Sequence, residues 1–123
     1  MGIYDFLLIA AGGAIGSIIR GILSAFLIGF SPWPTLVANL IGAFLIGILV
    51  KLMDNSMNPE SFRAFWIIGL CGGFTTFSAF GMEMVGFIKA SQWGLCIGYA
   101  FVSVIGSITA IFAGFRLYSY FQA

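Results

Sequence analysis

Four long apolar stretches constrain the fold of this chain more than any other feature of its sequence. They cover about Tyr4–Ile28, Thr35–Met53, Phe62–Ile88 and Trp93–Leu117. A helix of roughly 20 apolar residues crosses the hydrocarbon core of a bilayer, which is about 30 Å thick. Only 7% of the residues are charged, whereas a soluble domain usually has about 25%. The sequence therefore predicts an all-α integral membrane protein in which residues 1–123 form a single domain of four transmembrane helices.

Short connections rich in polar and helix-breaking residues join the stretches. They are Gly29–Pro34, Asp54–Ser61 and Lys89–Gln92. Because so little of the chain lies between the apolar stretches, any activity must reside within the membrane. We therefore expect the lipid bilayer to surround the chain and expect no nucleic-acid partner.

Basic residues give the orientation of the chain only a weak bias. If the N-terminus is cytoplasmic, Lys51, Arg63 and Arg116 lie inside or near that side, Lys89 lies outside, and Arg20 lies within the first helix. Cytoplasmic loops normally carry a clear excess of Lys and Arg. The weak bias permits insertion in both orientations, which is called dual topology.

The third stretch contains an unusual polar segment, GLCGGFTTFSAFGMEM, at Gly69–Met84. Gly72-Gly73 is a poor helix sequence, and Thr75-Thr76 are β-branched. We therefore expect the third helix to be broken mid-membrane, as occurs where the freed backbone groups are buried in protein or line a wet cavity. Freed carbonyls can bind a small cation, and freed N–H groups with the nearby hydroxyls can bind an anion.

Two phenylalanines and a carboxylate follow this segment at helical spacing. Phe77 and Phe80 are three residues apart, and Glu83 lies three further on. Such aromatic pairs usually serve packing, but the edge of a phenyl ring is electropositive and can face an anion. Glu83 is the only carboxylate deep within an apolar stretch, and intramembrane ionisable residues are candidate functional sites.

Further polar residues lie within the other stretches. Asn39 either makes a structural hydrogen bond between helices or lines a polar route. Tyr99, Ser103 and Ser107 recur every four residues and place a ladder of hydroxyls, about 12 Å long, on one helix face. These hydroxyls either bond to their own helix or form a polar track. Arg20 either extends toward the membrane surface or attracts anions into a vestibule.

Together these groups are mostly hydrogen-bond donors, which favours a small anion over a cation as the transported species. Four helices form a thin bundle, too thin for one subunit to enclose a polar route and hide its polar residues. We therefore expect a homodimer. From the residues alone, the function is a small-anion channel or transporter.

Three motifs in order resemble those of the Fluc (CrcB) fluoride channels. GGAIGSIIR at Gly12–Arg20 is similar to G-G-x-x-G-A-x-x-R, and TLVANLIGAFLIG at Thr35–Gly47 is similar to T-L-x-x-N-x-x-G-x-F-x-x-G. GLCGGFTTFSAF at Gly69–Phe80 resembles G-x-x-G-G-x-T-T-F-S-T-F. The resemblance implies a fluoride-selective channel, not an enzyme, that passively exports cytoplasmic fluoride across the bacterial inner membrane. It also implies an antiparallel, dual-topology homodimer with two pores.

The resemblance also assigns roles to residues. It implies a structural sodium ion at the dimer centre, held by the backbone carbonyls of Gly72 and Thr75. The residues expected along the fluoride path are Arg20, Asn39, Thr76, Phe77, Ser78, Phe80, Glu83, Tyr99, Ser103 and Ser107.

The chain departs from the family pattern at three positions. Ala79 stands where threonine is usual, so the pore region has one hydroxyl fewer. Ser17 replaces the usual alanine, and we expect this replacement to be harmless. Gly21 replaces the aromatic residue that commonly follows the arginine, so the vestibule lining differs.

Other function classes fit the sequence less well. A small dual-topology exporter of cationic drugs needs a membrane-embedded carboxylate in its first helix, and here that helix has only Asp5, at its very start. A non-transporting assembly subunit would pack Asn39 and the hydroxyl ladder against a different protein. A membrane enzyme fits least, because the sequence shows no nucleophile–base pair or metal cluster.

Overall fold

The computed structural model describes residues 1–29 and 31–122, so residue 30, in the expected connection Gly29–Pro34, lies outside the described residues. All regular structure in the described part is helical. The elements are α1 (Ile3–Phe26), α2 (Trp33–Asp54), α3 (Pro59–Phe62), the π-helical η1 (Arg63–Cys71), α4 (Gly72–Phe74), α5 (Phe77–Lys89) and α6 (Trp93–Gln122).

The four predicted transmembrane helices are confirmed as helical segments of sufficient length and apolarity. They comprise α1 with 24 residues, α2 with 22, the segment from α3 to α5 with 31, and α6 with 30. At about 1.5 Å per residue, even the shortest exceeds the thickness of a bilayer core. The observed ends differ from those predicted by a few residues, most at α6, which continues from the predicted Leu117 to Gln122.

The third segment begins earlier than its apolar pattern indicates. Pro59, predicted to lie in a connection, is the first residue of α3. Proline suits this position because its fixed φ is helical and its missing N–H needs no partner there. Asn58 caps the helix, with its Oδ1 accepting a hydrogen bond from the Ser61 N–H at 3.3 Å.

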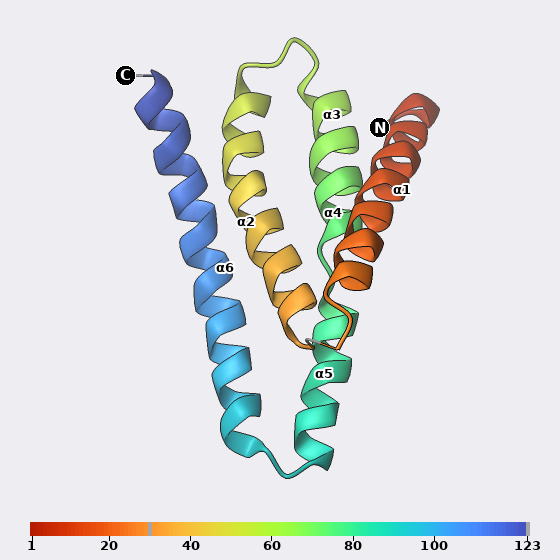
Figure 1. The fold of residues 1–123 in the computed structure, drawn as a ribbon. Coiled ribbons are helices and arrows are strands. Elements are labelled where there is room, and N and C mark those ends of the chain that lie inside the picture. The colour runs from red at the N-terminus through yellow and green to blue at the C-terminus, as the bar shows by residue number, and fades with distance from the viewer. Residues whose placement is uncertain (30, 123) are drawn as a thin grey trace.

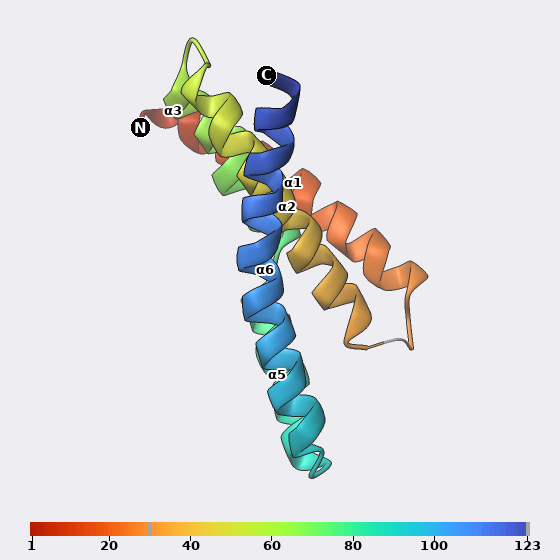
Figure 2. The same ribbon diagram turned by 90° about the vertical axis from the view of Figure 1, so that its left-hand side faces the viewer.

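The chain runs up and down through the bundle and returns to the end where it began. The N-terminus, the α2–α3 connection and the C-terminal end of α6 lie at one end of the molecule (Figure 1). The α1–α2 connection and the α5–α6 turn lie toward the other end. A quarter-turn of the view shows α5 and α6 extending together beyond α1 and α2 (Figure 2).

Glycine contacts bring α1 against the third segment. Gly12 and Gly16 are both buried in α1. A Cβ atom added at Gly12 would overlap the carbonyl oxygen of Phe65, and one added at Gly16 would overlap that of Leu70. Small residues permit this approach, and in lipid close packing replaces the hydrophobic effect as the force that joins helices.

The same principle joins α2 to α6. A Cβ atom at Gly47 would overlap the carbonyl oxygen of Ile111, and one at Gly114 would overlap that of Phe44. By contrast, a Cβ atom added at Gly94 would meet no heavy atom within 4 Å among the described residues. Gly94 therefore faces outward from this subunit, and the same holds for Gly98.

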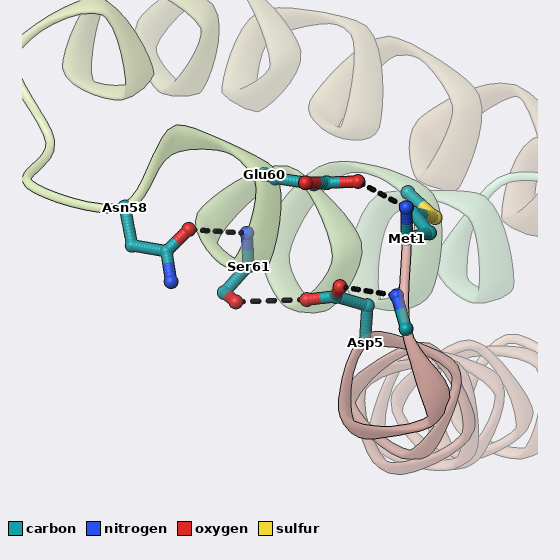
Figure 3. A network of polar contacts seen from close by, with 6 residues as sticks. Met1, Asp5, Asn58, Glu60 and Ser61 are labelled. Carbon is teal, nitrogen blue, oxygen red and sulfur yellow. Dashed lines mark hydrogen bonds and ion pairs between the residues drawn. The ribbon is translucent and has the colours of Figure 1, made fainter.

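A polar cluster ties the start of α1 to the start of α3 (Figure 3). Asp5 accepts a hydrogen bond from the Ser61 hydroxyl at 2.8 Å. The Met1 α-amino group lies 2.5 Å from Oε1 of Glu60, and the hydrogen bond to Glu60 raises the pKa of that amino group. The cluster engages Asp5, which is 8% exposed, in contacts at one end of the bundle.

Candidate ion pathway

The third segment is interrupted at Thr75 and Thr76, which lie between α4 and α5. Both residues have extended backbone, with φ/ψ of −86°/157° and −151°/126°. Gly72 and Gly73, the residues with the lowest helix propensity, remain helical in α4. Thr76 caps α5, because its Oγ1 accepts a hydrogen bond from the Ala79 N–H at 3.2 Å. The β-branched pair thus ends one helix and begins the next.

Asn39 of α2 holds the break from the side. Its Nδ2 donates to the Thr76 carbonyl at 3.0 Å, and its Oδ1 accepts from the Thr76 N–H at 2.8 Å. The amide therefore replaces both backbone hydrogen bonds that Thr76 would make in a regular element. One N–H of the Asn39 amide remains beyond this pairing.

Donors from α1 hold the other side of the break. Arg20 Nε donates to the Gly73 carbonyl at 3.2 Å, and the Ser17 hydroxyl donates to the same oxygen at 3.4 Å. The Thr75 hydroxyl donates to the Cys71 carbonyl at 2.8 Å. Arg20 and Ser17 thus satisfy a carbonyl that the helix end leaves free, whereas the Cys71 carbonyl also accepts the Thr75 N–H at 2.9 Å.

Beside the break, a groove of about 420 Å³ runs between α2, α5 and α6. Its wall combines the predicted polar and aromatic residues with aliphatic side chains. The lining residues are Asn39, Ala43, Ile46, Thr75, Thr76, Phe77, Phe80, Ser103, Val104, Ser107, Ile108 and Ile111.

Ser103 is the most informative residue of the groove wall. Its Oγ is buried, yet it has no hydrogen-bond partner among the described residues. A buried hydroxyl without a partner costs free energy, and such groups in native proteins call for an explanation. A polar species in the groove would supply the partner.

Aromatic rings line the groove near the break. The ring centroids of Phe77 and Phe80 are 5.5 Å apart, and those of Phe80 and Tyr99 are 5.0 Å apart. Phe77 is 83% exposed in the subunit, whereas Phe80 is half-buried. The two phenylalanines therefore share one wall but differ in how much of the subunit covers them.

Glu83 lies one turn along α5 from Phe80 and joins three helices. Its Oε1 accepts from the Thr35 hydroxyl of α2 at 2.5 Å, and its Oε2 accepts from the Tyr99 hydroxyl of α6. Thr35 and Tyr99 are both 7% exposed. Two donors thus compensate the carboxylate for leaving water, as buried charges require.

Thr35 is a site residue that the sequence reasoning missed. It lies four residues before Asn39, so the two side chains share a face of α2. That spacing was a usable signal, but the resemblance directs attention to the asparagine alone. Glu83 also borders a second hollow of about 380 Å³, which is lined by Ser31, Met82, Glu83, Gly86, Phe87 and Gln92.

Three further expected residues, Ser78, Arg20 and Gly72, lie outside the groove wall. Ser78 is exposed, with its Oγ 3.2 Å from the Thr76 hydroxyl oxygen. Arg20 lines neither hollow. Of the two expected cation ligands, Thr75 lines the groove and Gly72 is exposed on the subunit surface.

Comparison with known proteins places this architecture in a family. The CrcB-like protein family, described as camphor resistance (CrcB), matches residues 7–115. The chain belongs to the CrcB-like family. The match confirms the resemblance seen in the three motifs, and it includes the break, the groove and the Glu83 cluster.

Relatives within the CrcB-like family match nearly the whole chain. A protein of Agrobacterium fabrum named fluoride-specific ion channel FluC is 44% identical over 115 residues, which is 89% of this chain and 92% of the relative. Proteins of the same name from Leptospira interrogans and Thermus thermophilus are 44% and 38% identical. Their alignments cover 89% and 95% of this chain, and 91% and 95% of the relatives.

Proposed function

We propose that this chain is a fluoride-selective ion channel that lets cytoplasmic fluoride leave the cell passively. The relatives named above are fluoride-specific ion channels, and identities of 38–44% over nearly full length support the same activity here. The observation that carries the proposal is the buried, unpartnered hydroxyl of Ser103 in the wall of the groove.

The chemistry of the groove suits a small anion. The Oδ1 of Asn39 is already occupied by the Thr76 N–H, so the groups left for a ligand are mainly donors. These are the remaining Asn39 N–H, the hydroxyls of Ser103 and Ser107, and the electropositive ring edges of Phe77 and Phe80. A strongly hydrated anion that sheds water needs such replacements.

Along this proposed path, Glu83 and Tyr99 continue the groove toward the second hollow. Thr76 and Ser78 add hydroxyls at the break. The break itself lies at membrane depth in this proposal, because uninterrupted apolar helix flanks it within one spanning segment. Non-helical backbone at that depth is tolerated where it lines a cavity.

A second copy of the chain completes the channel in this proposal. The groove is open on one side, and Phe77, on its wall, is 83% exposed. A homodimer would cover both features, and the weak charge bias supports opposed orientations of its subunits. The assembly is then an antiparallel, dual-topology dimer in the bacterial inner membrane, with one four-helix domain per subunit and two pores.

A sodium ion at the dimer centre fits the backbone at the break. The hydrogen bonds described there use the carbonyls of Cys71, Gly73 and Thr76. Those of Gly72 and Thr75 take no part in them. Hard cations prefer oxygen ligands, and two copies of the chain would supply four such carbonyls. The ion would then hold the subunits together.

The rival function, export of cationic drugs, needs a membrane-embedded carboxylate in α1, and the only candidate is Asp5. Asp5 lies at the first turn of α1 and is engaged by Ser61 and by the Gly2 N–H. It therefore lies at the membrane edge and already has partners.

Ion efflux from liposomes tests the proposal. Liposomes that contain the purified protein and potassium fluoride are opened to potassium with valinomycin, and a fluoride electrode follows release. We expect rapid fluoride loss, and retention of chloride in parallel liposomes read with a chloride electrode. Ser103→Ala should slow fluoride loss, whereas Ser119→Ala, at an exposed site on the same helix, should not.

Three outcomes would contradict the proposal. They are fluoride retention by well-folded protein, chloride loss as fast as fluoride loss, and equal effects of the two serine variants. Fluoride retention by well-folded protein would favour the hypothesis of a non-transporting assembly subunit.

A further inference from the structure

We propose that Arg20 is a positioning residue that fixes the end of α4 at the break, with Ser17 as a secondary donor to the same carbonyl. The inference assigns Arg20 a hydrogen bond to the protein backbone as its main role, in place of direct contact with ions. It rests on the proposed function only where ion flux is measured.

The placement of Arg20 follows from a close contact between α1 and α4. A Cβ atom at Gly73 would overlap the carbonyl oxygen of Gly13, so the two glycines allow the backbones to touch. Ser17 and Arg20 lie four and seven residues after Gly13, on the same face of α1. Both side chains therefore reach the Gly73 carbonyl, at 3.4 Å and 3.2 Å.

The carbonyl they reach lacks a helical partner because of the break. Gly73 is the second-last residue of α4, and the chain becomes extended at Thr75 and Thr76. Carbonyls in the last turn of a helix have no intrahelical donor and carry the negative end of the helix dipole. A guanidinium is a favourable partner for such a group, and the carbonyl in turn compensates Arg20 for its place in an apolar helix.

The geometry favours this role over anion capture. Arg20 is half-buried, its Nε points at the backbone, and its side chain lines neither the groove nor the second hollow. An anion collector would present the guanidinium to the ion path. Ser17 stands where the family pattern has alanine, so this chain adds a second donor, and the longer distance makes it the weaker one.

A matched pair of substitutions separates a hydrogen-bond role from a charge role. Gln places its amide nitrogen the same number of bonds from Cα as Arg places Nε, whereas Met places a methyl group there. Arg20→Gln and Arg20→Met remove the same charge, but only Gln keeps a donor for the Gly73 carbonyl. A charge role predicts equal effects, and a hydrogen-bond role predicts rescue by Gln.

Hydrogen–deuterium exchange of the solubilised protein gives a readout that does not depend on transport. The amides of Thr75 and Thr76 report on the break, because they bond to the Cys71 carbonyl and the Asn39 Oδ1. We expect Arg20→Met to speed their exchange about tenfold, and Arg20→Gln to leave it close to that of the unmodified protein. Ser17→Ala should give a smaller increase than Arg20→Met.

Fluoride flux at saturating fluoride gives the second readout. We expect Arg20→Gln to retain most of the flux and Arg20→Met to lose most of it. Equal exchange rates in the two variants, or equal flux, would overturn the inference. If Arg20→Met does not fold, amide exchange of Arg20→Gln alone tests the inference. Exchange at the rate of the unmodified protein supports the inference, and faster exchange overturns it. If the unmodified protein carries no fluoride, the proposed function fails while the exchange comparison still decides this one.

Discussion

The side-chain amide of Asn39 is hydrogen-bonded to the protein backbone in this structure. Both sides of its amide are paired with Thr76, at 3.0 Å and 2.8 Å. A single side chain therefore joins α2 to the start of α5. If Asn39 lines the pore as proposed, a loss of ion flux on changing it would have two physical sources: a missing pore donor and a displaced break.

Replacing Asn39 should therefore reduce stability as well as flux. Asn39→Ala leaves the N–H and the carbonyl of Thr76 without partners, and we expect a loss of about 2 kcal/mol in the free energy of unfolding. Thermal unfolding of the solubilised protein measures it. Asn55→Ala is the control, because Asn55 is exposed at the end of α2. Equal stability of the two variants would contradict the structural role.

Individual polar residues of the site could be predicted from the sequence, but some of their contacts could not. Asn39, Ser103 and Ser107 could be grouped from the sequence because polar groups are rare in apolar helices, and the structure places all three on one groove wall. The spacing of Thr35 from Asn39 indicates only a shared helix face, whereas its bond to Glu83, at 2.5 Å, became evident from the packing of α5 against α2. Contacts between helices depend on their rotation, which periodicity alone does not fix.

At the scale of the helices, glycine contacts hold α1 against the third segment, which contains the break. Gly16 is buried in α1, and η1 and α4 form the surface it meets. Because α1 also carries Ser17 and Arg20, its distance from α4 decides whether their donors reach the Gly73 carbonyl.

Adding one methyl group at this contact should separate the helices. Gly16→Ala would place a Cβ atom into the carbonyl oxygen of Leu70, and we expect a loss of stability of about 2 kcal/mol. Gly94→Ala is the matched control, because its Cβ meets nothing within 4 Å and alanine favours helix. Thermal unfolding compares them. A Gly16→Ala variant as stable as Gly94→Ala would show that α1 packs elsewhere.

Helix boundaries and the break were predictable to different extents. The lengths of the apolar stretches predicted the four transmembrane helices. The polar segment Gly69–Met84 predicted that the third helix is broken, without giving the exact residues. Both Gly72-Gly73 and Thr75-Thr76 favoured a break, and in the structure the glycines remain helical, with Gly73 against Gly13, while the interruption lies at Thr75-Thr76. The π-helical η1, Arg63–Cys71, had no signal in the sequence.

At the scale of the whole molecule, one subunit leaves its ion path incomplete. The groove is open on one side, and Phe77 is largely exposed. In the proposed dimer a second copy would cover both features, so we expect oligomerisation and transport to fail together.

Removing sodium should show whether dimer formation and fluoride transport depend on each other. If Gly72 and Thr75 of two copies hold a sodium ion, exchange of sodium for N-methylglucamine during purification should weaken the dimer and abolish fluoride flux. Size-exclusion chromatography with light scattering measures the first effect, and liposome efflux the second. Restoring sodium should recover both. An active dimer in rigorously sodium-free buffer would rule out the central ion.

The return of α6 to the end where α1 begins has a consequence for gene fusion. With the N-terminus and the C-terminal end of α6 at the same end of the bundle (Figure 1), a flexible peptide between two copies in tandem would hold them in the same orientation. Subunits in opposed orientations could share one polypeptide only if the linker itself crossed the bilayer. A functional fusion would therefore need an odd number of spans, nine in place of eight by the count of four per copy.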